Sequence, residues 1–234
     1  MPKLVEYDPR ILIASIGGSS LFSEAKTLSP FARDHLADFI REQLRHERVL
    51  VAVVGGGPEA RVRMAAARAK HQNISSAQLD EIGIQVTRKN AAFIADWLKN
   101  DMDIRVQMFT FKQSIQSGII YLGYGTEPGH NTDYVAVQAA MEAGQKILLN
   151  ISNQPGLFRV SDGTTTDEVI PDITWGEYLR IAPTHYAGIQ HPFPKEAAQL
   201  AMENEMTVIL LGSVMDNIRR CISGEEFIGT VIHP

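Results

Sequence analysis

Continuous apolar runs alternate along the chain with segments whose apolar residues recur at helical spacing. The two clearest runs are 11–16 and 49–54, and each stops at glycines, Gly17-Gly18-Ser19-Ser20 after the first and Gly55-Gly56-Gly57 after the second. A short apolar run that ends at a turn signal is typical of a strand buried on both faces, as in a parallel sheet. Further strands are expected at 104–109, 119–122, 146–150, 207–211 and 228–233.

Helical periodicity fills most of the intervals between these runs. Ser29 and Pro30 suit the cap and the first turn of a helix that continues to about His46. Residues 152–172 are rich in Gly, Thr, Asp and Pro and predict hairpins and loops. Residues 182–193 predict a loop that is either mobile or faces a ligand. The remaining helices are expected at 58–70, 76–100, 132–143, 174–181, 194–204 and 214–222.

This alternation of strands and helices predicts an α/β protein with a largely parallel sheet that helices cover on both faces. In such sheets ligands bind at the carboxyl ends of the strands. Three glycine-rich loops, 17–20, 55–57 and 123–130, are predicted to fall there. No repeat, low-complexity tract or interdomain linker interrupts residues 1–234, so we expect a single domain.

Composition narrows the class of protein. The 44% hydrophobic and 21% charged content is ordinary for a soluble globular protein. A net charge of −5 without a sustained basic stripe argues against a nucleic-acid binder. No apolar run is long enough for a membrane span, and the first ten residues lack a signal-peptide pattern. The lone Cys221 excludes an internal disulfide and fits a reducing compartment, so a cytoplasmic location is expected.

The glycine loops are candidate phosphate cradles. Consecutive backbone N–H groups form concave anion sites, and a helix N-terminus adds partial positive charge. Arg61, one turn into the helix after Gly55-Gly56-Gly57, is placed to grip a phosphate. For Gly17-Gly18-Ser19-Ser20 alone, a cradle and a simple tight turn are equally open. Two cradles at the ends of two parallel strands predict a protein that brings two phosphate groups together.

Asn131-Thr132-Asp133 precedes a predicted helix and has two interpretations. These are favoured helix-cap residues. A carboxylate beside two phosphate cradles could also orient a lysine or a Mg²⁺-bound water, because in phosphoryl transfer the protein mainly positions groups and neutralises charge. Asp80 either binds a ribose hydroxyl or faces solvent.

Two histidines, His185 and His191, fall in the predicted loop with Tyr186 near them. Six residues apart in a loop is no specific spacing for metal ligands. We therefore expect no metal site there, although contact with a ligand is open.

Five segments, taken in order, form a pattern that spans nearly the whole chain. They are Ile16-Gly17-Gly18-Ser19, Val54-Gly55-Gly56-Gly57 with Ala60-Arg61, 82–88 with Asn90-Ala91, 128–133 and 229–232. Together they resemble the amino acid kinase family, and most of all its uridylate (UMP) kinase branch. The resemblance implies a three-layer α/β/α sandwich around a mainly parallel sheet, with ATP as phosphoryl donor, Mg²⁺, and UMP as acceptor. It also implies a homo-oligomer, commonly a dimer-based hexamer.

The resemblance also implies roles for individual residues. One group lies at the transferred phosphate and towards ATP, namely Gly17, Gly18, Ser19, Asn153, Gly156 and Phe158. A second group holds UMP, namely Gly55, Gly56, Gly57, Arg61, Asp80 and Thr132. Asp133 is the implied catalytic-site carboxylate, and Gly18 and Ser19 are grouped with it.

The chain departs from the family pattern at three positions. Ser15 stands where many members have a lysine, and Pro155 and Pro194 stand where the kinases have aspartates. Lys146 or Lys195 could replace the missing lysine. The alternative to a UMP kinase is a non-catalytic nucleotide- or oxoanion-binding member, either regulatory or similar to molybdenum storage protein and paired with a related subunit. Phosphorylation of another small acid is also open.

Overall fold

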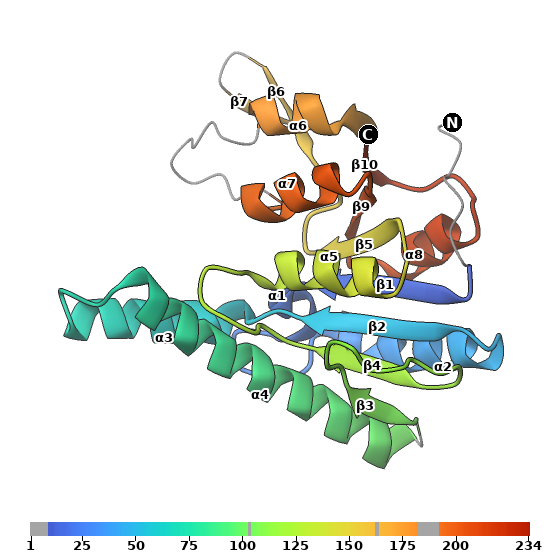
Figure 1. The fold of residues 1–234 in the computed structure, drawn as a ribbon, viewed down its shortest axis with the longest axis horizontal. Helices are drawn as coiled ribbons and strands as arrows, with labels where there is room; N and C mark the ends of the chain where they lie inside the picture. Colours follow the sequence, from blue (N-terminus) through green and yellow to red (C-terminus); the bar gives the residue numbers. More distant parts are fainter. Residues whose placement is uncertain (1–8, 103, 162–163, 182–191) are drawn as a thin grey trace.

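An eight-stranded sheet runs through the centre of the computed structural model, which describes residues 9–102, 104–161, 164–181 and 192–234 (Figure 1). The strands follow the spatial order β3-β4-β2-β1-β5-β9-β10-β8. The two glycine-terminated runs form neighbouring central strands, as predicted. The bounds are β1 Ile11–Ile16, β2 Val49–Val54, β3 Val106–Met108, β4 Ile120–Gly123, β5 Ile147–Ser152, β8 Asp172–Thr174, β9 Thr207–Gly212 and β10 Gly229–His233.

The sheet is mainly parallel, and its one antiparallel pairing is between β9 and β10. Helix α8 and a short connector join these two strands, and the Asn217 side chain holds the end of the connector. Its amide nitrogen donates to the Ile228 carbonyl oxygen (2.7 Å), and its amide oxygen accepts from the Ile228 N–H (2.8 Å). From there β10 runs back along β9. The sequence pattern predicted β10 but not its direction.

The predicted helices form with small shifts at their ends, and two details differ. Most of the first glycine loop forms a short helix, α1. The helix after Ser29 opens with a π-helical segment, and the Ser29 hydroxyl accepts from the Ala32 N–H (3.1 Å), so Ser29 caps it as predicted. The bounds are α1 Gly18–Leu21, η1 Ala32–Leu36, α2 Ala37–Arg45, α3 Gly57–Lys70, α4 Ser76–Met102, α5 Thr132–Glu142, α6 Trp175–Ile181, α7 Lys195–Glu203 and α8 Met215–Ile222.

Within residues 152–172, predicted to hold hairpins and loops, β6 (Phe158–Ser161) pairs with β7 (Thr164–Val169) as an antiparallel hairpin. The same stretch ends in β8, which adds an edge strand to the main sheet and was not predicted. The predicted loop at 182–193, with His185, Tyr186 and His191, lies almost entirely outside the described residues.

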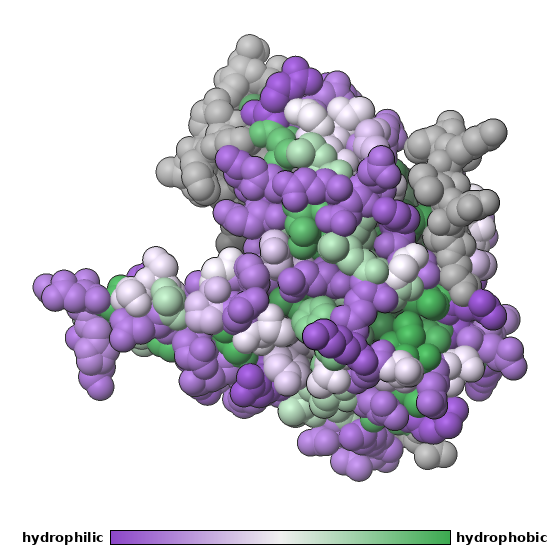
Figure 2. Space-filling view, in the orientation of Figure 1, coloured by the Kyte–Doolittle hydropathy of each residue, from purple (hydrophilic) through white to green (hydrophobic). Residues whose placement is uncertain are grey.

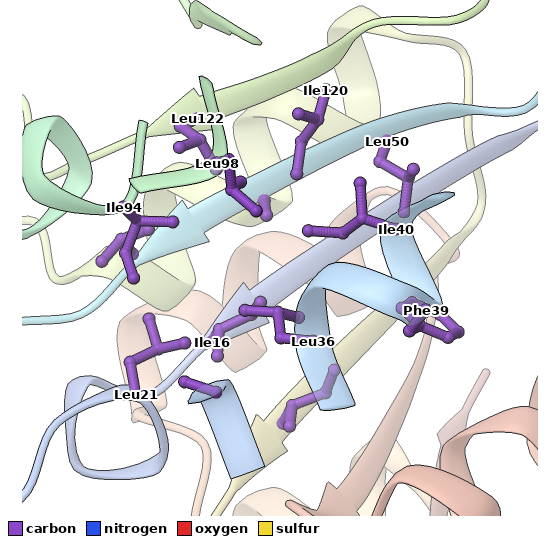
Figure 3. Packing of buried hydrophobic residues seen from close by; sticks show 14 of the residues in the cluster. Ile16, Leu21, Leu36, Phe39, Ile40, Leu50, Ile94, Leu98, Ile120 and Leu122 are labelled. Atoms are coloured by element: carbon purple, nitrogen blue, oxygen red, sulfur yellow. The ribbon is translucent and has the colours of Figure 1, made fainter. Parts of the chain in front are cut away.

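Each face of the sheet buries its own hydrophobic layer. One layer packs α5, α6 and α7 on side chains such as Ile13, Leu148 and Leu210. The opposite layer packs η1, α2, α4 and α8, with Leu36 and Ile40 facing the strands (Figure 3). The three-layer α/β/α sandwich is therefore confirmed.

Helices α3 and α4 extend beyond the sheet as a projecting pair (Figure 1; left of Figure 2). Only Glu59 and Ala60 of α3 are buried, both in its first turn. The first turn of α3 is thus the part of this helix that the protein core holds in place.

None of the helices in the described ranges has the length and hydropathy that crossing a bilayer requires.

Candidate functional site

The two glycine loops leave the sheet side by side. β1 and β2 pair in parallel with Ile16 opposite Val54, so their carboxyl ends meet at one edge. The Gly55 N–H donates to the Ile16 carbonyl oxygen (2.9 Å), and the Gly17 N–H donates to the Ile151 carbonyl oxygen at the end of β5 (2.9 Å). Three neighbouring strands therefore fix where the loops begin.

A cleft of about 660 Å³ opens at this edge. Gln154 and Pro192 from two other segments also contribute to its wall. The sequence-predicted residues that line it are Gly17, Gly18, Ser19, Gly55, Gly56, Gly57, Arg61, Thr132 and Asn153. The structure thus brings both candidate cradles to one cavity, as the strand order predicts.

Helix α4 orients the second glycine loop. The buried amide of Asn90 donates to the carbonyl oxygens of Gly55 (3.0 Å) and Gly56 (3.1 Å). These carbonyl oxygens, which would repel a phosphate, are turned towards α4 and away from the cleft. Glu59, at 9% exposure in the first turn of α3, is held by Lys89 (3.0 Å) and Arg63 (2.5 Å). Burial opposes ionisation of Glu59, but the hydrogen bonds from Lys89 and Arg63 outweigh it and lower its pKa.

Arg61 links the two loops across the cleft. Its Nη1 donates to the Ser19 hydroxyl at 3.2 Å. Among the described residues that line the cleft, Arg61 is the one lysine or arginine. Positive charge for a bound phosphate therefore comes from this side chain and from backbone N–H groups.

Asn153 ties the loop after β5 to the first glycine loop. Its amide oxygen accepts from the Ser20 hydroxyl (3.0 Å), and its amide nitrogen donates to the Ser19 carbonyl oxygen (3.2 Å). Gly156 and Phe158, predicted to lie towards ATP, are not among the described residues that line the cleft. A β-carbon at Gly156 would lie 2.7 Å from the Thr230 Oγ1, so packing against β10 accounts for a glycine there.

Asp133, in the first turn of α5, lies directly beside Thr132 of the cleft wall. Its Oδ1 accepts from the Ser15 hydroxyl (2.6 Å) and from the Asn150 amide nitrogen (2.7 Å). Burial raises the pKa of Asp133 to about 6, and the hydrogen bonds from Ser15 and Asn150 oppose that rise. The helix cap itself is Asn131, whose side chain accepts from the Tyr134 N–H (2.8 Å).

Asp80 anchors the third glycine-rich loop. Its Oδ2 accepts from the Gly129 N–H (2.9 Å), and Thr87, two turns along α4, accepts from the Gly125 N–H (3.0 Å). Asp80 was predicted either to bind a ribose or to face solvent, and its contact with the loop was not anticipated. Asp80 is not among the described residues that line the cleft.

The residues at the departures from the family pattern are placed as follows. Lys146 lies just before β5, at the opposite end of that strand from the cleft, and its Nζ donates to the Asn204 carbonyl oxygen (2.7 Å), so it does not replace the missing lysine. Lys195 is exposed at the start of α7 and is not among the cleft-lining residues described. Pro194 is the N-cap of α7, and Pro155 packs on Gly212.

Sequence reasoning missed Asn150 as a site residue. It occupies the fourth position of the otherwise mostly apolar run Ile147–Ser152. A polar side chain in a strand buried on both faces needs a hydrogen-bond partner. That requirement was the available sequence signal.

Comparison with known proteins agrees with the fold. The model of the amino acid kinase family matches residues 10–212. A uridylate kinase of Methanothermobacter thermautotrophicus is 30% identical over 233 residues, which cover 95% of this chain and 99% of that protein. A uridylate kinase of Methanobrevibacter smithii is 29% identical over 230 residues, 94% of this chain and 98% of that protein.

Solved structures show the same fold. A UMP kinase from Bacillus anthracis superimposes with a TM-score of 0.74 at 19% identity, over 96% of each chain. A uridylate kinase from Archaeoglobus fulgidus gives a TM-score of 0.67 at 23% identity, over 95% of this chain and 99% of that one. Because the family model spans most of its length, the chain belongs to the amino acid kinase family.

Proposed function

We propose that the protein is a nucleoside monophosphate kinase that transfers the γ-phosphate of ATP to UMP. The observation that carries this proposal is the meeting of Gly17–Ser19 and Gly55–Gly57 in one cleft, with Thr132 on its wall. Asp133 directly follows Thr132 in the first turn of α5. Phosphoryl transfer requires two phosphate groups held end to end and their charge neutralised. The uridylate kinase names of relatives that match nearly the whole chain support UMP as the acceptor.

The proposed division of labour follows the two sides of the cleft. Backbone N–H groups of Gly18 and Ser19 bind the transferred phosphate, while Gly17, whose own N–H donates to the Ile151 carbonyl oxygen, fixes where the loop begins. Arg61 steadies the acceptor phosphate by a charge-assisted hydrogen bond. Asp133 carries a negative charge next to Thr132 and orients the groups that meet there. The family resemblance assigns Gly55, Gly56, Gly57, Asp80 and Thr132 to UMP, and Asn153, Gly156 and Phe158 to ATP. Asp80, Gly156 and Phe158 have these roles on resemblance alone, because they are not among the described residues that line the cleft.

Mg²⁺ enters this proposal as part of the substrate. Within the described ranges no three His, Cys, Asp or Glu side chains gather into a metal site, so the protein's own donors do not fit a resident metal. Bound to the phosphate oxygens of ATP, Mg²⁺ would supply charge neutralisation. Nucleotide binding is therefore expected to require Mg²⁺ mainly on the donor side.

A coupled assay with Mg²⁺, ATP and UMP tests the proposal. Folded protein should form ADP only when both nucleotides are present. Asp133→Asn keeps an acceptor for Ser15 and Asn150, and it should lower turnover by about 100-fold or more. Absence of ADP above background from folded wild-type protein would reject the proposal. Light scattering on the same sample tests the predicted homo-oligomer.

The second candidate is a nucleotide- or oxoanion-binding protein without turnover. Its support is the scarcity of positive charge, since Ser15 replaces the usual lysine and Arg61 is the one cationic side chain among the described cleft residues. Separate calorimetric titrations of ATP and UMP distinguish this candidate from the kinase, because nucleotide binding without ADP formation supports a regulatory sensor. Molybdate clusters found by metal analysis of the purified protein would support storage.

A further inference from the structure

Ser15 and Asn150 are buried polar residues at matching positions of two adjacent strands. They are direct partners in the parallel register of β1 and β5. Only 1% of Ser15 and 4% of Asn150 is exposed. Alternation along the strands places both on the face covered by α5, the face of Ile13 and Leu148. Each interrupts an apolar row at the end nearest the cleft.

Both side chains donate to the same atom. Asp133 Oδ1 accepts from Ser15 at 2.6 Å and from Asn150 at 2.7 Å. No hydrogen bond to Asp133 Oδ2 is found from any residue in the described ranges. One carboxylate oxygen is therefore fixed towards the sheet, and the other has no protein partner there. Asp133 itself is not among the described residues that line the cleft, but it directly follows Thr132, which is.

The hydrogen bonds of the Asn150 side chain are only half satisfied, so its own stability does not account for an amide at this position. Its Oδ1 is buried and lacks a hydrogen-bond partner among the described residues. A buried acceptor without a partner destabilises the fold, and a leucine would continue the apolar row without that penalty. The amide cannot be flipped to relieve it, because the nitrogen must face the carboxylate.

We propose that Asn150 is a positioning residue of the cleft: with Ser15 it holds Asp133 by two neutral donors, so that the free carboxylate oxygen faces the bound phosphates. This inference rests on the proposed function, in which ionised Asp133 is the active form. A lysine at position 15 would have neutralised the carboxylate, whereas Ser15 and Asn150 orient it and leave its charge uncompensated.

The consequence concerns the protonation of Asp133. Hydrogen bonds to the charged form of an acid favour that form. Loss of the Asn150 donor should therefore raise the pKa of Asp133 above its wild-type value. The acid limb of the kcat profile should move to higher pH, and kcat at pH 6 should fall by about threefold to tenfold. A merely structural role for Asn150 predicts no shift of the limb.

Asn150→Leu is the primary test, read by ¹³C NMR titration of the Asp133 carboxyl and by the pH dependence of kcat. Asp133→Asn assigns the resonance. Ser15→Ala removes the other donor and should shift both readouts in the same direction, which keeps the test available should Asn150→Leu not fold. Thr207→Val is the matched control, because it removes a buried hydroxyl from β9 at the end of the sheet away from the cleft, and it should change neither.

The two readouts separate this inference from the proposed function. An Asp133 pKa that stays at its wild-type value in Asn150→Leu and in Ser15→Ala would overturn the positioning role, whatever the activity. A raised pKa in a protein that makes no ADP would support the positioning role and reject the kinase. A raised pKa with an acid limb moved by the same amount supports both.

Discussion

Gly18 and Gly57 touch backbone to backbone at the floor of the cleft. A β-carbon at Gly57 would lie 2.6 Å from the Gly18 carbonyl carbon and 2.7 Å from its oxygen. Gly57 also has a positive φ of 61°, a conformation that glycine adopts without strain. The two glycine loops are therefore in close backbone contact, and a change of shape in one is expected to move the other.

We expect Gly57→Ala to damage binding and stability together. The methyl group clashes with backbone, which cannot rotate away as a side chain could, so the free energy of unfolding should fall by about 3 kcal/mol or more. Urea unfolding and nucleotide titration measure the two effects.

Gly144→Ala separates the clash from backbone strain. Gly144 has a similar φ of 66°, but a β-carbon there meets nothing within 4 Å. It should lose only about 1 kcal/mol and keep full nucleotide affinity. Equal losses in the two variants would show that strain, and not contact with Gly18, requires glycine at position 57.

Asp133→Asn should make the protein more stable above pH 6. In the folded state burial raises the pKa of this carboxyl from 3.8 to about 6, so between these values the folded protein holds a proton that the unfolded chain has released. The favourable contribution is complete below pH 3.8 and is lost as pH rises through 6. At pH 7.5 the variant should gain at most about 3 kcal/mol in unfolding free energy.

Denaturant unfolding of both proteins across pH 5 to 8 measures this difference. The difference should shrink to about half by pH 5, because the folded wild type then holds the proton while its unfolded chain still releases it, and it would vanish only below pH 3.8. A difference that stays constant with pH would mean that Asp133 does not titrate in this range. If Asp133→Asn gains stability and loses turnover, the buried carboxylate costs stability and is retained for its role in the reaction.

Arg61→Ala should weaken nucleotide binding by about tenfold to a hundredfold, as expected for the loss of a charge-assisted hydrogen bond. Its guanidinium touches Ser19 of the opposite loop and lines the cleft. Arg68→Ala is the matched control, since Arg68 is exposed two turns further along the same helix. Calorimetric titration with UMP measures the affinity of each variant. Equal UMP affinities of Arg61→Ala and Arg68→Ala would show that Arg61 does not bind the phosphate.

The sequence predicted strand-end loops better than it predicted contacts between distant segments. The runs before Gly17 and Gly55 identified β1 and β2 because burial on both faces leaves a continuous apolar pattern. The contact of Asp80 with Gly129 depends on how a loop folds over α4, and spacing along the chain contains no information about it. The direction of β10 likewise depends on how the connector after α8 folds back, where Asn217 holds Ile228 by two hydrogen bonds.

Ser15 is a second residue whose role could not be predicted from the sequence. In the sequence it stands where many family members have a lysine, so it was interpreted only as a missing positive charge. In the structure it is a donor to Asp133, and its partner Asn150 comes from a strand 135 positions later in the chain. The meaning of a substitution at a family position therefore depended on a neighbour that only the sheet register identifies.

Thr230 belongs to the segment 229–232, the last of the segments that resemble the family, and it supports the fold away from the cleft. Its fully buried hydroxyl accepts from the Leu157 N–H (2.8 Å) and donates to the Ile170 carbonyl oxygen (2.6 Å), and so joins both ends of the β6–β7 hairpin to β10. Thr230→Val keeps the shape and leaves two backbone groups unpaired, so unfolding free energy should fall by about 2 to 4 kcal/mol.

Thr230→Ser retains the hydroxyl and should lose about 1 kcal/mol, the value of a buried methyl group. Urea unfolding followed by circular dichroism compares the two variants. Because the hairpin begins shortly after Asn153, Thr230→Val should also weaken ATP binding while UMP binding changes little. Equal weakening for both nucleotides would mean that Thr230 supports the whole sheet and not the donor side in particular.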